Sequence, residues 1–232
     1  MLPFSCCTEF VSLHNPLVRD GQQAVGSHPN LRYERRLWRT GLRAVAGLDE
    51  AGVGPIAGPV VAAAVIFEPE TFIKGVNDSK QLKPVEREAY FTQIYQGALA
   101  VGIGVASRGE IDELNIFWAT MAASQRAILS LSRTPDHVLV DGRLIRELKL
   151  PQTRIVGGDR KSFCIAAASI IAKVTRDRMM IEYDVQFPGY GFAQHKGYGT
   201  PEHFEMLERL GPSPLHRRSF APVWEAAQRK LF

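Results

Sequence analysis

Short apolar runs recur along the chain between turn residues, and their length favours strands over helices. Buried strands typically span about four to eight apolar residues bounded by glycine, proline or polar turn residues. A glycine-rich turn joins the first two such runs and a helical segment precedes the third, which favours an antiparallel meander. The pattern predicts five strands, at residues 44–48, 58–67, 98–107, 137–141 and 154–159.

Longer segments with helical periodicity lie before, between and after these strands. The spacing predicts helices at residues 33–42, 85–96, 116–132, 162–184, 201–210 and 221–231. Ser162 is a suitable N-cap for the longest helix, and the small side chains at 166–169 would let that helix pack closely on a sheet. A meander followed by alternating helices and strands indicates an α/β domain, with a mixed five-stranded sheet flanked by helices.

The first 40 residues differ from the rest of the chain. They carry prolines and glycines with little periodicity, so we expect a poorly ordered extension over residues 1–40, with a short helix near its end. The main domain is expected over residues 41–222, including a helical C-terminal part. Residues 223–232 are expected to form a C-terminal helix or tail.

Composition and charge narrow the class of protein only slightly. The 232 residues are 45% hydrophobic, which suits one globular domain, and 28 Lys and Arg against 24 Asp and Glu give a net charge of +4. That excess suits a polyanionic partner without predicting one. Three cysteines, two of them adjacent, argue against a disulfide framework. The start of the chain lacks a signal-peptide pattern and no segment is long and apolar enough to span a bilayer, so we expect a cytoplasmic protein without a membrane partner.

Three of the predicted strands end in acidic residues. Asp49 and Glu50 directly follow residues 44–48, Asp141 is the last residue of 137–141, and Asp159 is the last residue of 154–159. A single Asp after a strand is equally consistent with a turn, but ligands bind beyond the strand ends of open α/β sheets, where acids from separate strands converge. Converging carboxylates repel one another unless a cation neutralises them, and oxygen ligands favour Mg²⁺ or Mn²⁺. Two such ions suit phosphodiester hydrolysis.

The stretch Asp49-Glu50-Ala51-Gly52-Val53-Gly54-Pro55 raises a geometric question. Adjacent residues of a regular strand point to opposite faces, so Asp49 and Glu50 serve one site only if the strand ends between them. Gly52 and Gly54 would allow such a turn and would also leave backbone groups open to a sugar or a phosphate. An ordinary hairpin turn explains the glycines equally well.

Several motifs in this order resemble the ribonuclease HII family, the bacterial type 2 ribonucleases H. They are DEAGVGP at 49–55, GPVVAA at 58–63, NDSKQL at 77–82, DELNI at 112–116, VLVDG at 138–142, GGD at 157–159, AAASIIAKVTRD at 166–177, YGFAQHKGYGT at 190–200 and HRRSF at 216–220. The resemblance spans about residues 44–222. It implies a ribonuclease H sheet with a helical C-terminal extension, in an endonuclease that cuts the RNA strand of RNA–DNA hybrids and incises at single ribonucleotides in duplex DNA during ribonucleotide excision repair.

The resemblance also implies roles for individual residues. Asp49, Glu50, Asp141 and Asp159 match the four catalytic acids; Asp49, Glu50 and Asp141 are the metal ligands we expect, with Asp159 joining on a second ion. Gly52, Val53 and Gly54 match the loop whose backbone binds the ribose 2′-hydroxyl, Tyr198 matches a tyrosine that stacks on the following deoxyribose, and Lys80 and Lys196 are candidate phosphate contacts. The products would carry 5′-phosphate and 3′-hydroxyl ends, and the enzyme would act as a monomer.

Val53 departs from the family pattern, which usually has Arg at this position. A β-branched residue resists positive φ, and a lost charge would weaken strand binding. One alternative is therefore a catalytically weakened protein that binds RNA–DNA hybrids. Another is a type 3 ribonuclease H, although proteins of that type carry a sizeable additional N-terminal domain. The sequence leaves both alternatives open, together with the choice between Mg²⁺ and Mn²⁺.

Overall fold

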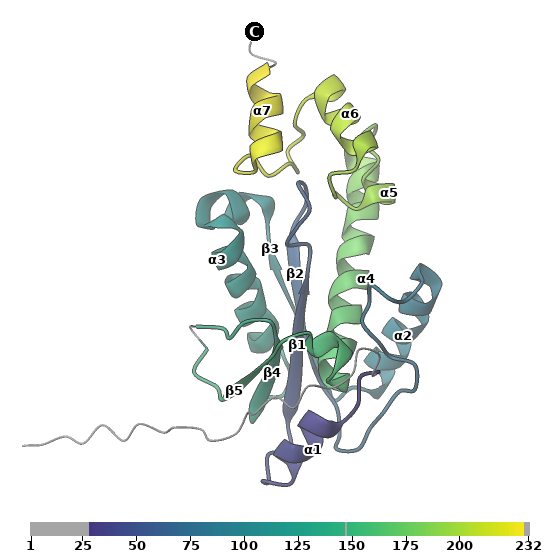
Figure 1. Cartoon of the computed structure of the whole chain (residues 1–232), viewed down its shortest axis with the longest axis vertical. Helices are drawn as coiled ribbons and strands as arrows, with labels where there is room; N and C mark the ends of the chain where they lie inside the picture. The colour runs from purple at the N-terminus through teal and green to yellow at the C-terminus, as the bar shows by residue number, and fades with distance from the viewer. Residues whose placement is uncertain (1–27, 147, 230–232) are drawn as a thin grey trace, which may run out of the picture.

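The computed structural model describes residues 28–146 and 148–229 and forms one mixed sheet between helices (Figure 1). Its strands are β1 (Val45–Ala51), β2 (Val60–Ile66), β3 (Ala100–Ala106), β4 (His137–Asp141) and β5 (Gln152–Ile155). Its helices are α1 (Arg32–Trp38), α2 (Pro84–Gly97), α3 (Arg108–Leu129), α4 (Phe163–Gln186), α5 (Phe192–His195), α6 (Pro201–Leu210) and α7 (Ala221–Arg229), with a 3₁₀ turn at Gly158–Arg160.

The sheet has the order β3-β2-β1-β4-β5. β1 and β2 pair antiparallel, as do β2 and β3, which confirms the predicted meander. β4 then adds parallel to β1, and β5 adds parallel to β4. The central strand β1 therefore has a neighbour on each side, and its C-terminal end lies beside that of β4.

Each face of the sheet is covered by one long helix (Figure 1). α4 packs against one face, where its small residues 166–168 join Val65 and Leu139 in a buried cluster. α3 packs against the other face, where Ala119 and Ala123 contact a second cluster that includes Leu48. Small side chains on both helices bring the helix axes close to the sheet, which leaves the strands buried from both sides.

The C-terminal helices α5, α6 and α7 gather at one end of the molecule, beyond the turn that joins β1 to β2 (Figure 1). Ile56 of that turn packs with Leu207 of α6 and Val223 of α7. Ala57 packs with Met180 of α4 and Phe192 of α5. The C-terminal extension thus holds the β1–β2 turn in place.

The structure corrects several predicted boundaries. Residues 32–38 form α1, which confirms the short helix predicted near the end of the extension, and its Trp38 and Glu34 are buried; residues 1–27 lie outside the described residues. Glu34 accepts hydrogen bonds from the Ser162 hydroxyl and the Cys164 amide at the start of α4, at 2.6 and 3.0 Å. The boundary expected at residue 222 falls inside α7. Among the described residues, no helix has the length and apolar character that crossing a membrane requires.

Helix α3 begins eight residues before the predicted start at residue 116. Asn115 interrupts it with φ of 68°, and its side chain accepts hydrogen bonds from the amides of Phe117 and Trp118 at 3.0 and 3.2 Å. Asn115 therefore caps the second helical segment, which is the one that the periodicity predicted. Ser107 caps the first segment together with Glu110.

Candidate active site

Three carboxylates meet at the edge of the sheet where β1 and β4 end. β1 and β4 are parallel with Leu48 opposite Val140, which puts Asp49 beside Asp141 one residue further on. Asp159 comes from the 3₁₀ turn four residues beyond β5, and the Gly158 amide donates to Asp141 at 2.8 Å. Oxygen atoms of Asp49, Asp141 and Asp159 all lie within 4.8 Å of one another, as the strand-end acids predicted.

Asp159 reaches the cluster by a different route from the one predicted. We expected a strand over residues 154–159, but β5 ends at Ile155. Gly157 adopts left-handed φ of 63°, and the chain then turns tightly so that Asp159 is 4% exposed. The turn, rather than a strand, aims this carboxylate at the other two.

The cluster carries more negative charge than its surroundings balance. Burial raises the pKa of Asp49 well above its usual range, and the charges of Glu50 and Asp141 raise it further. Burial, followed by the charges of Asp78 and Asp141, raises the pKa of Asp159 to about 6, although Lys80 opposes this. Buried acids that disfavour ionisation in this way are a fitting donor set for a hard divalent cation, which would restore their charged form.

Glu50 approaches the same acids from the other face of β1. β1 continues to Ala51, so the prediction that the strand ends between Asp49 and Glu50 is wrong, and Glu50 lies outside the three-carboxylate cluster. Burial and then the charge of Asp141 nevertheless raise the pKa of Glu50 to about 7, although the positive charges of Lys80 and Arg143 lower it. Glu50 lines a cavity of about 380 Å³ beside α3, together with Val53, Phe117 and Asp141.

Two buried arginines hold the turn that follows β1. Arg217 donates to the carbonyl oxygens of five turn residues, which are Gly52, Val53, Pro55, Gly58 and Pro59. Arg176 donates to Ala57, Pro59 and Lys196. The sequence analysis assigned no individual role to Arg176 or Arg217, and both are fully buried. Each lies in a quoted motif, but nothing in the pattern distinguished a carbonyl-binding arginine from a surface one.

Gly52 and Gly54 of this turn differ in whether the fold requires glycine. Gly52 has φ of +95°, and a Cβ there would lie 2.1 Å from Nε of Arg176. A Cβ at Gly54 would have no heavy atom within 4 Å, so the fold does not require glycine there. The open space is available to a ligand. Val53 is absent from the described residues with positive φ, so it fits the turn without the strain that its β-branch would cause, and it is 39% exposed.

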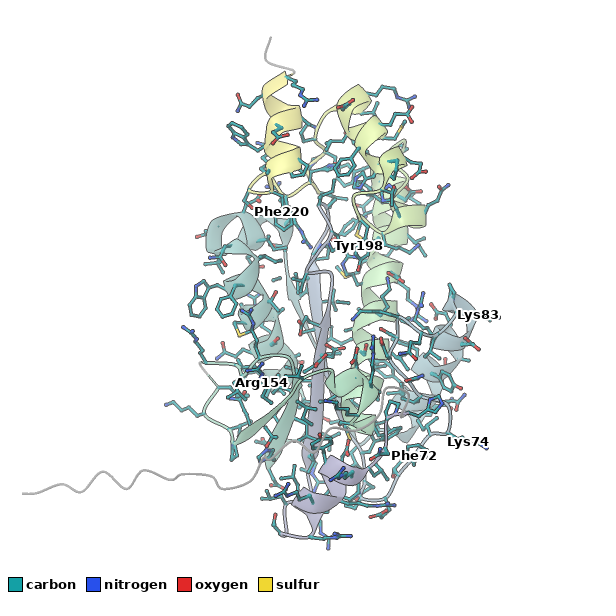
Figure 2. All side chains as sticks on the ribbon, in the orientation of Figure 1. Phe72, Lys74, Lys83, Arg154, Tyr198 and Phe220 are labelled. Carbon is teal, nitrogen blue, oxygen red and sulfur yellow. The ribbon has the colours of Figure 1, made fainter. Side chains whose placement is uncertain are left out.

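Tyr198 lies beside α4 near the C-terminal helices (Figure 2) and is 44% exposed. Its ring centre is 5.9 Å from Nζ of Lys173, a residue that the sequence analysis missed because a lysine within a long amphipathic helix carries no signal. Lys80 places Nζ 3.8 Å from Asp159 and is largely exposed. Lys196, by contrast, donates to the carbonyl of Ala193 in its own short helix, which does not support the predicted phosphate contact.

Comparison with known proteins gives these residues a family context. The sequence model of the family described as Ribonuclease HII matches residues 46–223. This range includes every candidate site residue described above. Ribonuclease HII of Geobacillus kaustophilus (strain HTA426) is 56% identical over 195 residues, which cover 84% of this chain and 75% of that protein. The crystal structure of ribonuclease H2 from Pyrococcus horikoshii OT3 has a TM-score of 0.69 and 29% identity, over 80% of this chain and 97% of that one.

A more distant structure helps to separate the alternatives. Bst-RNase HIII in complex with Mn²⁺ has a TM-score of 0.62 at 20% identity, covering 81% of this chain and 71% of that one. At that identity the likeness shows a common fold, whereas the 56% identity with a ribonuclease HII covers 84% of this chain. The sheet, the helices and the C-terminal extension confirm the predicted ribonuclease H-like architecture. The chain is a ribonuclease H, and it belongs to the ribonuclease HII family.

Proposed function

We propose that this protein hydrolyses the RNA strand of RNA–DNA hybrids and incises at ribonucleotides embedded in duplex DNA, using two divalent ions and leaving 5′-phosphate and 3′-hydroxyl ends. The observation that carries the proposal is the meeting of Asp49, Asp141 and Asp159 within 4.8 Å at a buried sheet edge. Family membership supports action on hybrids. The acids and the adjoining turn support the finer statement.

The acidic residues would hold the ions. Asp49 would contact both ions, with Asp141 on one and Asp159 on the other, since oxygen atoms of the three carboxylates lie within 4.8 Å of one another. Glu50 would contribute from the opposite face of β1. When bound, two such ions supply a hydroxide at neutral pH and stabilise the leaving oxygen. The donor set suits Mg²⁺ and Mn²⁺ alike, and the Bst-RNase HIII structure is a complex with Mn²⁺.

The β1–β2 turn and Tyr198 would recognise the substrate. The two arginines bind carbonyl oxygens of the turn from inside the protein, which leaves its outer side, with Gly54 and Val53, available to a ribose hydroxyl. Tyr198 would stack on a sugar without a 2′-hydroxyl, because an added hydroxyl would crowd the ring. Lys80, whose ammonium is largely exposed, would contact a phosphate beside the acids. Lys173 instead donates to Asp177 at 2.6 Å and would support the site beside Tyr198 from within.

Cleavage of a DNA duplex that contains one ribonucleotide tests the proposal directly. We expect incision with Mg²⁺ or Mn²⁺, none with EDTA, and none of an all-DNA duplex of the same sequence. Product ends are assigned by ligation and by phosphatase treatment, and light scattering tests the monomer. Cutting that persists in EDTA, or that needs no ribonucleotide, would contradict the proposal.

The second candidate function, a weakened hybrid-binding protein, is motivated by Val53. Replacing Val53 with Arg should strengthen hybrid binding, because the side chain is exposed beside the acids and a new charge there would contact one phosphate. The plot of log affinity against log salt should steepen by about 0.9, the value for one added phosphate contact. Binding is measured by fluorescence anisotropy over a salt series in Ca²⁺, so that cutting does not interfere.

Val185→Arg is the matched control, since it adds the same charge at the far end of α4, where Val185 is 80% exposed. It should leave the slope unchanged. Equal slopes for Val53→Arg and the original protein would show that position 53 does not face the nucleic acid. Hybrid binding by the original protein without any cutting in Mn²⁺ would favour the weakened-binder function.

A further inference from the structure

Three histidines pack together beneath the loop that carries Tyr198. His203 of α6 and His216 are fully buried. The His195 and His203 rings are stacked, with centroids 4.0 Å apart, and the His203 and His216 centroids are 5.1 Å apart. None of the three contacts the acidic cluster described above, so the proposed chemistry leaves them without a role.

The hydrogen bonds of His216 and His203 define which nitrogen carries each proton. The Ser213 amide donates to Nδ1 of His216 at 3.0 Å, so that nitrogen is unprotonated and Nε2 carries the hydrogen. Nε2 of His216 lies 3.0 Å from Nε2 of His203, which must therefore accept. The remaining proton of His203 is on Nδ1, which donates to the Tyr198 carbonyl oxygen at 2.8 Å.

This chain of bonds requires both rings to be neutral. A second proton on His203 would point two N–H groups at each other across 3.0 Å. Burial favours the neutral form, lowering the pKa of His203 to about 4 and that of His216 to about 3. The arrangement therefore persists throughout the neutral range.

The same cluster fixes the backbone on both sides of Tyr198. His195 accepts from the Gly197 amide at 3.1 Å and lies 2.7 Å from the Tyr190 carbonyl oxygen. The Tyr198 carbonyl also accepts from the Thr200 amide at 2.9 Å. Tyr198 is nearly half exposed, with Lys173 and Arg176 beside its ring, so the backbone bonds help to fix the position of the ring.

We propose that His203 and His216 are positioning residues for Tyr198, so that recognition of the ribonucleotide–deoxyribonucleotide junction depends on a pair of buried neutral histidines. The inference rests on the proposed stacking role of Tyr198. Neither histidine touches the nucleic acid. They hold the Tyr198 carbonyl in place, and with it the ring. In that position the ring would clash with a 2′-hydroxyl on the sugar that it stacks on.

Two substitutions of His203 separate its two hydrogen bonds. In His203→Asn the amide nitrogen takes the place of Nδ1 and keeps the donor to Tyr198. In His203→Gln the amide reaches the place of Nε2, keeps the contact with His216 and loses the donor. The readout is the ratio of kcat/KM for a single-ribonucleotide duplex to kcat/KM for a continuous hybrid, with thermal unfolding recorded for each variant.

We expect Tyr198→Ala to lower this ratio and His203→Gln to lower it in the same direction by about three- to tenfold, the range that one lost hydrogen bond allows. His203→Asn should stay within about twofold of the original ratio. Adding His203→Gln to Tyr198→Ala should change the ratio no further, because the tyrosine is then absent. A purely structural role would instead lower kcat/KM equally on both substrates.

The outcomes distinguish the inference from the function on which it rests. An unchanged ratio in Tyr198→Ala would overturn the stacking role, and the positioning role with it. A lowered ratio in Tyr198→Ala with an unchanged ratio in His203→Gln would overturn the positioning role alone. If His203→Gln does not fold, ¹⁵N NMR of the original protein at pH 7 gives the test: Nδ1 of His203 should be protonated and Nε2 not, and the opposite tautomer or an imidazolium overturns the inference.

Discussion

Replacing Asp49 with Asn should lower metal-dependent cleavage on the order of a thousandfold or more, because the side chain would lose the charge that places it between both ions. The same change should stabilise the protein in the absence of divalent ions. Asp49 is 6% exposed, and burial and its acidic neighbours disfavour its charge, so a neutral isostere relieves that penalty. A gain of about 1 kcal/mol would raise Tm by about 2–4 °C in a protein of this size.

Lost activity together with raised stability distinguishes a removed metal ligand from a misfolded protein. Cleavage of the single-ribonucleotide duplex and thermal unfolding with EDTA are measured on the same sample, and unfolding is then repeated with Mn²⁺. Mn²⁺ should raise Tm of the original protein more than that of the variant. Glu182→Gln, an exposed acid on α4, is the control and should change neither. Full activity in Asp49→Asn would remove this residue from the site.

The convergence of Asp49, Asp141 and Asp159 was predictable from the sequence because each lies at the end of a short, mostly apolar run and strand ends converge in α/β sheets. Which strands pair was not predicted: the structure pairs β1 with β4, and that pairing brings Asp49 beside Asp141. The approach of Asp159 was not predictable in detail, since a 3₁₀ turn depends on Gly157 adopting left-handed φ. A pair of glycines after a strand is compatible with several turns.

Glu50 shows where local periodicity was applied correctly and still gave the wrong conclusion. Alternation along β1 does place Asp49 and Glu50 on opposite faces, but the strand does not end between them. The acids instead surround the C-terminal end of β1, where Asp141 influences the pKa of both residues. Which face of a strand is accessible depends on the helices that cover it, and those contacts are not local in sequence.

The interior arginines and histidines were beyond prediction for a related reason. Of the basic residues in HKGYGT and HRRSF, only Lys196 was given a role, as a candidate phosphate contact, since charged side chains are usually exposed. Arg217 is buried because the β1–β2 turn, more than 150 residues away in sequence, presents five carbonyl oxygens that need donors. Only the tertiary fold brings these carbonyl acceptors and the guanidinium donors together.

Replacing Arg217 with Ala should have the largest effect on both stability and activity of any single change outside the acids. The substitution would leave buried carbonyl oxygens of Gly52, Pro55 and Gly58 without their donor, and such losses together cost about 3–5 kcal/mol. The turn that follows the metal-binding strand would lose its fixed shape. We expect kcat/KM on the single-ribonucleotide duplex to fall by about a hundredfold, the effect of roughly an ångström of misplacement.

Arg217→Lys separates charge from geometry. A lysine keeps the positive charge but presents donors from one atom, which cannot serve carbonyl oxygens spread around a planar guanidinium. Its effect should therefore lie near that of the alanine variant, in urea unfolding and in cleavage. Burial and the nearby charge of Arg176 already lower the pKa of Arg217 to about 9, so this residue is held by its hydrogen bonds and not by a favourable field. Arg218→Ala, which removes the exposed neighbour, should be close to neutral; equal effects of the two alanine variants would mean that general positive charge, and not the shaped turn, supports the site.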